Sequence, residues 1–159
     1  MDNQRPSIDQ YFLKIAACVA ERSTCKRRHV GAVLVRDKHI ISTGYNGAAA
    51  GVTDCLSLGC LRDELMIPSG TRHEICRAIH AEQNAVIQAA LHGGNMEGAT
   101  LYCTHSPCIL CAKILVNARI IRFVTCHKYQ DDAFIELFRE ANVQVDILPP
   151  PDERVNFQY

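Results

Sequence analysis

Residues 99–126 read ATLYCTHSPCILCAKILVNARIIRFVTC, and this stretch decides the fold class. Two apolar runs, 99–104 and 120–126, have the length and composition of buried strands, and the segment 108–117 between them has the length of a helix. Because a helix of about ten residues separates the two strands, they are predicted to pair in parallel through a right-handed crossover. The chain is therefore expected to have an α/β fold.

Similar patterns on both sides of this unit extend the fold. The further predicted elements are helices over 9–22, 79–92 and 131–141, an antiparallel hairpin of strands over 30–35 and 39–43, a strand over 143–148, and a long loop over 44–77. Helices packed around one sheet predict a three-layer α/β/α arrangement. We expect a single domain over residues 1–148, followed by an extended C-terminal tail over 149–159.

The composition narrows the class of protein. The chain has 159 residues, which fits one domain with a real core. No apolar run approaches the roughly 18 residues that span a membrane, and the polar N-terminus lacks a signal-peptide core, so a cytoplasmic protein is expected. Nine cysteines in such a protein favour metal binding over disulfides. Seventeen basic and seventeen acidic residues cancel, which disfavours a nucleic-acid partner.

Two short motifs supply the ligands of a catalytic zinc site. His80 starts the helix predicted over 79–92, and Cys108 and Cys111 lie in the first turn of the helix predicted over 108–117. Cysteines three positions apart share one helix face, and the positive N-terminal end of the helix favours their thiolate form. One histidine and two cysteines leave the fourth position of a tetrahedral zinc ion to water, as in a catalytic site.

Glu82 completes the motif His80-Ala81-Glu82 and need not bind the metal. Residues two apart on a helix point to nearly opposite sides, so His80 and Glu82 can converge only where the chain enters the helix. Glu82 is then expected to shuttle protons while zinc lowers the pKa of its bound water. Each motif alone has a commoner interpretation, a redox dithiol or structural zinc for C-x-x-C and two surface residues for His-x-Glu. Their combination favours catalytic zinc, because each half begins a helix.

Other polar residues remain to be assigned. Arg22, Lys26 and Arg28 are candidates for contacts with a phosphate, and a solvated basic loop is the alternative. Three cysteines lie in apolar helix or strand patterns and are expected in the core: Cys18, Cys103 and Cys126.

The motifs identify a resemblance to a known family. The sequence resembles the cytidine and deoxycytidylate deaminase superfamily, in particular its bacterial and phage deoxycytidylate deaminases, over residues 10–147. The pattern H-x-E followed by P-C-x-x-C marks the zinc nucleobase deaminases. The matching stretches are Arg22–Cys25, Val30–Val35, Gly44–Gly47, His80–Ala85, Gly98–Tyr102 and Pro107–Lys113. The resemblance implies a five-stranded mixed sheet between helices.

The resemblance also implies an activity and a set of nucleotide contacts. The activity is hydrolytic deamination of dCMP to dUMP and ammonia by a zinc-bound hydroxide, in pyrimidine nucleotide synthesis. Asn46 resembles the asparagine that binds the sugar, and the backbone around Ala81 resembles the part that binds the pyrimidine edge. Tyr129 lies where the family often places an aromatic residue near the nucleotide, and a surface aromatic is the alternative. Arg28 is a substrate-binding candidate for the phosphate.

A second, structural zinc is often present in this family. Cys25 and Cys55 match its positions by their spacing from the motifs Val30-Gly31 and Gly44–Gly47, and His73 and Cys76 are three apart just before the catalytic helix. The predicted ligand set is Cys25, Cys55, His73 and Cys76, with Cys60 in reserve. A closed site with four ligands would fix the long loop to the hairpin. The alternative is a group of reduced cysteines without metal.

Assembly and regulation are implied only by the resemblance. Family members form hexamers in which dCTP activates and dTTP inhibits, and Mg²⁺ would accompany such a nucleotide effector. Many members carry Pro and Arg shortly after the Gly44–Gly47 motif, where this chain has Ala48-Ala49-Ala50-Gly51. This departure leaves open whether a triphosphate is an effector or a substrate.

Three alternative functions stay open at the level of the sequence. The first keeps the chemistry and changes the substrate to dCTP, a free nucleoside or the pyrimidine intermediate of riboflavin synthesis. The second is an editing enzyme that deaminates a base in tRNA or single-stranded DNA, which calls for an extended basic surface lined by aromatic residues. The third is an interaction module that has no catalytic activity and whose fold is stabilised by zinc.

Overall fold

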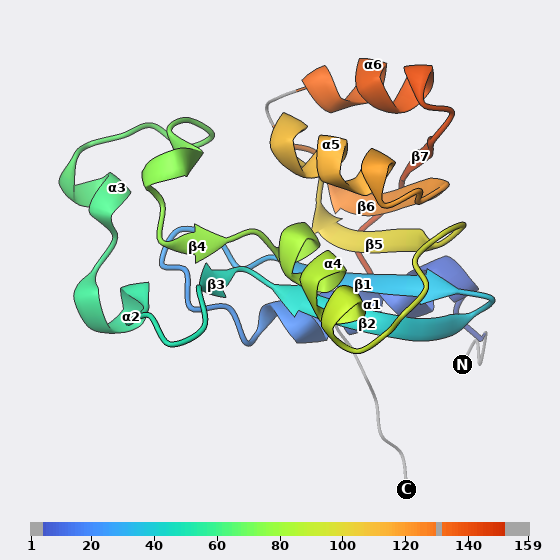
Figure 1. The fold of residues 1–159 in the computed structure, drawn as a ribbon, viewed down its shortest axis with the longest axis horizontal. Coiled ribbons are helices and arrows are strands. Elements are labelled where there is room, and N and C mark those ends of the chain that lie inside the picture. Colours follow the sequence, from blue (N-terminus) through green and yellow to red (C-terminus); the bar gives the residue numbers. More distant parts are fainter. Residues whose placement is uncertain (1–4, 130–131, 152–159) are drawn as a thin grey trace, which may run out of the picture.

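The computed structural model describes residues 5–129 and 132–151, and its centre is a five-stranded sheet (Figure 1). The strand order is β2-β1-β5-β6-β7. The strands are β1 (Gly31–Arg36), β2 (His39–Tyr45), β5 (Thr100–His105), β6 (Arg122–His127) and β7 (Gln144–Ile147). Strand β1 pairs antiparallel with both β2 and β5, whereas β5, β6 and β7 pair in parallel. The predicted mixed sheet and the parallel crossover are therefore confirmed.

The helices cover both faces of this sheet. On one face lies α1 (Ile8–Ala20), whose Phe12 and Leu13 share a buried cluster with Val33 and Val124 of the strands. The other face carries three helices, α4 (Ala81–Leu91), α5 (Ile109–Asn117) and α6 (Ala133–Glu140). Their buried side chains pack on Leu34, Leu101 and Phe123. Alternate residues of β1 thus serve opposite layers, which confirms the three-layer α/β/α arrangement.

Two glycines of the hairpin allow helices to approach the sheet closely. A Cβ atom on Gly44 would lie 2.3 Å from the Ala81 carbonyl oxygen, at the start of α4. A Cβ atom on Gly31 would lie 2.0 Å from the Ala16 carbonyl oxygen of α1. Neither distance is compatible with a side chain. Gly44 therefore fixes the start of α4 directly against β2, and this contact positions the motif His80-Ala81-Glu82.

The segment between β2 and α4 is more structured than the predicted loop over 44–77. Its elements are β3 (Gly47–Ala48), α2 (Cys55–Leu58), α3 (Leu61–Glu64), the 3₁₀ helix η1 (His73–Ile75) and β4 (Ala78–Ile79). Strands β3 and β4 pair antiparallel, so the two ends of the segment meet. The helices have three or four residues each, too few to produce a helical hydrophobic period. In Figure 1 this segment extends to one side of the sheet.

Two cysteine assignments are confirmed and one is wrong. Cys103 and Cys126 are buried in β5 and β6, as predicted. Cys18 is exposed, because the buried face of α1 is formed by Phe12, Ala16 and Ala20, and Cys18 lies on the opposite side of the helix.

The C-terminal region follows the sheet for only a short distance within the described residues. Leu148 donates its backbone N–H to the Thr125 carbonyl at 2.8 Å, and the Pro149 carbonyl accepts from Gln10 Nε2 at 3.1 Å. Most of the tail predicted over 149–159 lies outside the described residues, which end at 151.

Among the described helices, none combines the length and apolar character needed to cross a membrane.

Candidate active site

The two sequence motifs lie at the starts of two helices. His80 is the N-cap residue of α4, and its backbone N–H donates to Gln83 Oε1 at 2.9 Å. Cys108 is the N-cap residue of α5, and its sulfur accepts from the Cys111 N–H at 3.5 Å. Both helices follow strands, β4 and β5, that bring their N-terminal ends together on one side of the sheet. The predicted positions of these residues at helix starts are therefore confirmed.

Three side chains at these helix starts form a group that fits a metal ion. His80 Nδ1 lies 3.6 Å from Cys108 Sγ and 3.3 Å from Cys111 Sγ. The bond lengths of a tetrahedral zinc ion place nitrogen and sulfur ligands about 3.5 Å apart. Within residues 5–129 and 132–151, no other set of three histidine, cysteine or acidic side chains has all its ligand atoms within 4.8 Å of one another. The donor set and its spacing therefore fit zinc.

The electrostatics of this group favour a thiolate at Cys108. The hydrogen bond with Cys111, together with His80 and the helix N–H, lowers the pKa of Cys108 to about 3. The same hydrogen bond and burial raise the pKa of Cys111. The pair therefore shares one proton between two adjacent sulfurs. A divalent cation would release that proton and stabilise both thiolates.

Glu82 is a buried carboxyl group beside this cluster. It is 4% exposed, and burial raises its pKa to about 7 although the nearby His80 lowers it. Glu82 is the second residue of α4 and lies in the first turn of the helix. This is the position at which the sequence predicts that the side chains of Glu82 and His80 converge. A carboxyl group with a pKa near 7 can both accept and release a proton at neutral pH, which suits general acid–base catalysis.

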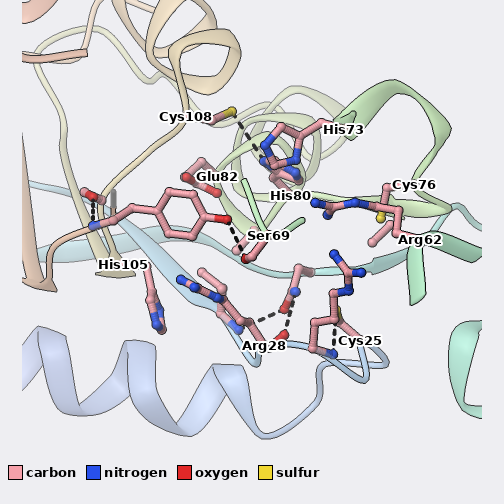
Figure 2. A pocket seen from close by; sticks show the side chains of 17 residues that line it. Cys25, Arg28, Arg62, Ser69, His73, Cys76, His80, Glu82, His105 and Cys108 are labelled. Carbon is pink, nitrogen blue, oxygen red and sulfur yellow. Dashed lines mark hydrogen bonds between the residues drawn. The ribbon is translucent and has the colours of Figure 1, made fainter. Parts of the chain in front are cut away.

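One cavity connects these groups to the loops around them. Figure 2 shows His80, Glu82 and Cys108 on one side of this cavity and Arg28 on the other. Its lining combines basic, aromatic and hydroxyl side chains with one carboxyl group, Glu82, and such groups can orient a polar ligand. His80, Glu82 and Cys108 therefore line a cavity that also contains cationic side chains.

The predicted nucleotide contacts mostly line the same cavity. Ala81, Tyr129 and Arg28 are all lining residues. The Tyr129 N–H donates to Ser106 Oγ at 2.6 Å, its hydroxyl lies 3.2 Å from Ser69 Oγ, and the Arg28 guanidinium stacks 4.3 Å from its ring centroid. Tyr129 thus connects both sides of the cavity rather than standing alone at the surface. Two other basic candidates are exposed and do not line the cavity: Arg22 and Lys26.

Asn46 lines the cavity and also holds the loop before β1. Its Oδ1 accepts from Ser23 Oγ at 2.6 Å and from the Val30 N–H at 2.8 Å. Its Nδ2 donates to the Arg28 carbonyl at 2.8 Å, which leaves one amide hydrogen for another acceptor. Asn46 therefore fixes the backbone that carries Arg28, in addition to the sugar contact predicted for it.

The residues predicted for the second zinc divide between two neighbouring places. Burial raises the pKa of Cys55, and the nearby thiols of Cys60, Cys76 and Cys25 raise this pKa further. These four cysteines therefore surround one region. His73 instead packs against His80, with ring centroids 4.9 Å apart, and lines the cavity. Among the described residues, no three of these cysteines have all their sulfur atoms within 4.8 Å of one another.

The cavity also has five polar lining residues that the sequence motifs do not predict: Arg27, Arg62, Ser69, His105 and Ser106. Arg62 belongs to the charged run Leu61–Glu64, which has the composition of a solvated surface. His105 directly follows a strand, but histidine at a strand end is common. Burial, with the nearby His127 and Arg28, lowers the pKa of His105 to about 4, so this side chain is neutral at pH 7. No local sequence signal distinguishes these residues.

Comparison with known proteins identifies the same region. A family model described as the cytidine and deoxycytidylate deaminase zinc-binding region matches residues 6–127. The ComE operon protein 2 of Bacillus subtilis is 41% identical over 90% of this chain and 72% of its own length. The deoxycytidylate deaminase of Schizosaccharomyces pombe is 37% identical over 95% of this chain, which spans 47% of the yeast protein.

A solved structure extends the likeness to the whole fold. The dCMP deaminase of the cyanophage S-TIM5, in complex with dCMP and dUMP, superposes with a TM-score of 0.74 and 29% identity. The match covers 92% of this chain and 100% of the phage chain. The matched family region contains both zinc motifs, and the fold agrees from α1 to the end of the sheet. This chain belongs to the cytidine and deoxycytidylate deaminase family.

Proposed function

We propose that this protein hydrolyses dCMP to dUMP and ammonia. The observation that carries the proposal is the meeting of His80, Cys108 and Cys111 with the buried carboxyl group of Glu82 beside one cavity that is also lined by basic side chains. The names of the yeast relative and of the cyanophage enzyme, whose structure holds dCMP and dUMP, support this substrate. A cytosine nucleotide also fits a cavity whose lining carries several basic side chains and a single carboxyl group, Glu82.

The chain's own residues perform the proton transfers. A zinc ion held by His80, Cys108 and Cys111 would, when bound, lower the pKa of water from about 16 towards 7. Glu82 accepts a proton from the attacking water and delivers it to the N3 atom of the pyrimidine ring. Glu82 then carries the second water proton to the 4-amino group, which leaves as ammonia. One water is consumed and its oxygen becomes the 4-carbonyl group of dUMP.

The surrounding residues orient the nucleotide. Ala81 is the first residue of α4, so its N–H has no acceptor within the helix and can bind the edge of the base. The proposed contact with the deoxyribose uses the remaining amide hydrogen of Asn46. Tyr129 closes one side of the cavity and supports Arg28, which reaches towards the phosphate. These groups hold the 4-amino carbon near Glu82, which supplies the proximity that catalysis needs.

We further propose a structural zinc in the segment between β2 and α4. The ligand set that the placement favours is Cys25, Cys55, Cys60 and Cys76, with Cys60 taking the place of the predicted His73. Four cysteines are a common closed ligand set for structural zinc. The measurement that tests this proposal is the zinc content of the purified chain, with two ions expected per chain.

Assembly, regulation and location extend the proposal through the family resemblance. We propose a cytoplasmic homohexamer, which the molar mass in solution tests. Control by dCTP and dTTP, with Mg²⁺, is tested by adding each triphosphate to the dCMP assay. A response of the rate to low concentrations of either nucleotide would support an effector site despite the altered stretch Ala48–Gly51.

The substrate proposal is tested by measuring ammonia release from dCMP, dCTP, cytidine and deoxycytidine under identical conditions. The expected result is the highest kcat/KM for dCMP. Faster turnover of dCTP or of a nucleoside would retain the chemistry and contradict the substrate. Absence of ammonia from all four, with zinc bound, would contradict the proposed activity.

A further inference from the structure

Unpartnered polar atoms gather around the cavity. Among the described residues, four buried side-chain atoms have no hydrogen-bond partner: Thr24 Oγ1, Arg27 Nη1, Arg62 Nε and His73 Nδ1. Arg27, Arg62 and His73 all line the cavity. Buried polar groups are nearly always hydrogen-bonded in folded proteins, and each exception calls for an explanation. Three exceptions in one cavity indicate that a ligand completes their hydrogen bonds.

Arg62 is the most unusual of these residues. It is only 7% exposed, and its one hydrogen bond runs from Nη2 to the Pro68 carbonyl at 3.2 Å. No carboxylate pairs with it among the described residues. Figure 2 shows its side chain extending across the cavity towards His80. The guanidinium group therefore faces the cavity with most of its donors free.

Arg122 shows how this chain satisfies another partly buried arginine. Its side chain is 25% exposed, and it bonds to both carboxylate oxygens of Asp9 at 2.9 and 3.0 Å and to Asp146 at 2.6 Å. Arg62 is more deeply buried and has no such partner. A buried charge without a counter-ion is strongly unfavourable, so the described residues leave Arg62 able to bind an anionic ligand.

The other charges of the cavity agree with an anionic ligand. Arg28 also lacks a carboxylate among the described residues and stacks on Tyr129. Arg27 is paired with Asp63 at 2.6 Å, and Glu82 is the single carboxyl group of the lining. A nucleotide whose base lies at Glu82 has one strongly anionic group, its phosphate. The planar fork of an arginine matches that group with two parallel hydrogen bonds.

We propose that Arg62 binds the 5′-phosphate of the nucleotide and so makes the site selective for a nucleotide over a nucleoside. This inference rests on the proposed function, since it assigns one part of the same cavity. Arg28, supported by Tyr129, provides a second cation. Arg62 itself takes no part in the proton transfers, which belong to Glu82. Its removal should therefore affect binding of the phosphate and leave the chemistry of a nucleoside unchanged.

The test compares zinc-loaded full-length wild type with the variants Arg62→Gln and Arg62→Lys. Calorimetry measures the affinities of dUMP and deoxyuridine, and ammonia release measures kcat/KM for dCMP and deoxycytidine. Loss of a charge-assisted hydrogen bond should weaken dUMP binding and reduce kcat/KM for dCMP by about 10- to 100-fold in Arg62→Gln. Arg62→Lys keeps the positive charge but lacks the planar guanidinium group, so its losses of dUMP affinity and of kcat/KM for dCMP should be smaller. The matched control is Arg139→Gln, an exposed arginine of α6.

The nucleoside measurements separate binding from folding. Unchanged affinity for deoxyuridine and unchanged turnover of deoxycytidine in Arg62→Gln would support a phosphate contact. Equal losses for nucleotide and nucleoside, or no loss for either, would overturn it. If wild type binds dUMP in an Arg62-dependent way but releases no ammonia from dCMP, the proposed activity fails while the phosphate site stands.

Discussion

The paired starts of α4 and α5 and the segment between β2 and α4 are built in different ways. The helix starts carry two pairs of residues that are neighbours in the sequence. One pair is His80 and Glu82 at the start of α4, and the other is Cys108 and Cys111 at the start of α5. A strand and the following helix fix each pair. In the other segment, Cys55, Cys60, Cys76 and Arg62 are held by three short helices and a two-residue strand pair, and Cys25 lies in the loop before β1. The first region contains the proposed reacting groups, and the second lines the cavity beside them.

We expect the helix starts to carry out the reaction and the segment between β2 and α4 to help bind the nucleotide. The helix starts derive their geometry from the sheet, whose core is almost completely buried, so we expect the proposed reacting groups to be preorganised. The segment between β2 and α4 has little core of its own and exposes several apolar side chains, among them Leu56, Leu65 and Met66. We therefore expect its stability to depend on the proposed metal and on ligand contacts. Changes in the two regions should have different consequences.

The largest effect is expected at the helix starts. Cys108→Ala removes one of three ligands of the proposed catalytic zinc, and turnover should fall by about four orders of magnitude or more. Zinc content should decrease from two ions to one per chain, because the second site is independent. Cys18→Ala, which alters an exposed cysteine of α1, is the control and should keep both ions and full activity. Full activity of Cys108→Ala would remove the proposed metal site.

An intermediate effect is expected in the segment between β2 and α4. Cys55→Ser should also reduce the zinc content from two ions to one, but the catalytic ion should remain. Since binding of a structural zinc contributes directly to folding, the free energy of unfolding should decrease by several kcal/mol, as denaturation in urea can measure. Turnover at low temperature should decrease far less than in Cys108→Ala. A wild-type chain with a single zinc ion would contradict this prediction.

The smallest effect is expected in the scaffold, away from both regions. Arg122 lies at the start of β6, the opposite end from the helix starts, and its hydrogen bond lowers the pKa of Asp9. A lowered carboxyl pKa contributes stability above the ordinary value of 3.8 and loses it as pH falls through the folded-state value. Asp9→Asn should therefore cost about 1–3 kcal/mol at neutral pH, with normal turnover.

Unfolding experiments across a range of pH check the sign of this prediction. The difference between wild type and Asp9→Asn should be largest near neutral pH. It should shrink as pH falls below the ordinary carboxyl value of 3.8 and disappear below the lower folded-state pKa of Asp9. An equal difference at all values of pH would mean that the variant acts through packing rather than through the ion pair with Arg122.

The sequence predicts the sheet, the layers and the reacting groups because each has a local periodic signal. The alternation of strands and helices over 99–148 and the two motifs at helix starts need no long-range information. Helix ends differ from prediction by one or two residues, as at α1 and α6, where the structure ends the helices at Ala20 and Glu140. Such differences are expected where terminal turns fray.

The environment of the cavity could not be predicted in the same way. Arg62 and Ser69 are separated from Tyr129 by more than fifty residues, and only the folded chain brings them together. A charged run such as Leu61–Glu64 predicts solvent exposure, yet Arg62 is buried because the surrounding loops cover it. The placement of His73 beside His80 rather than among the cysteines likewise depends on backbone geometry that spacing alone does not specify.

The most direct test of the account is ammonia release from dCMP by Glu82→Gln, with zinc content and thermal unfolding measured on the same preparation. Gln keeps the size of the side chain and removes its capacity to carry a proton. The account predicts two zinc ions per chain, an intact fold and turnover lower by roughly 10²–10⁴-fold or more. Turnover equal to that of wild type, with zinc bound, would contradict the role of Glu82 and the mechanism built on it.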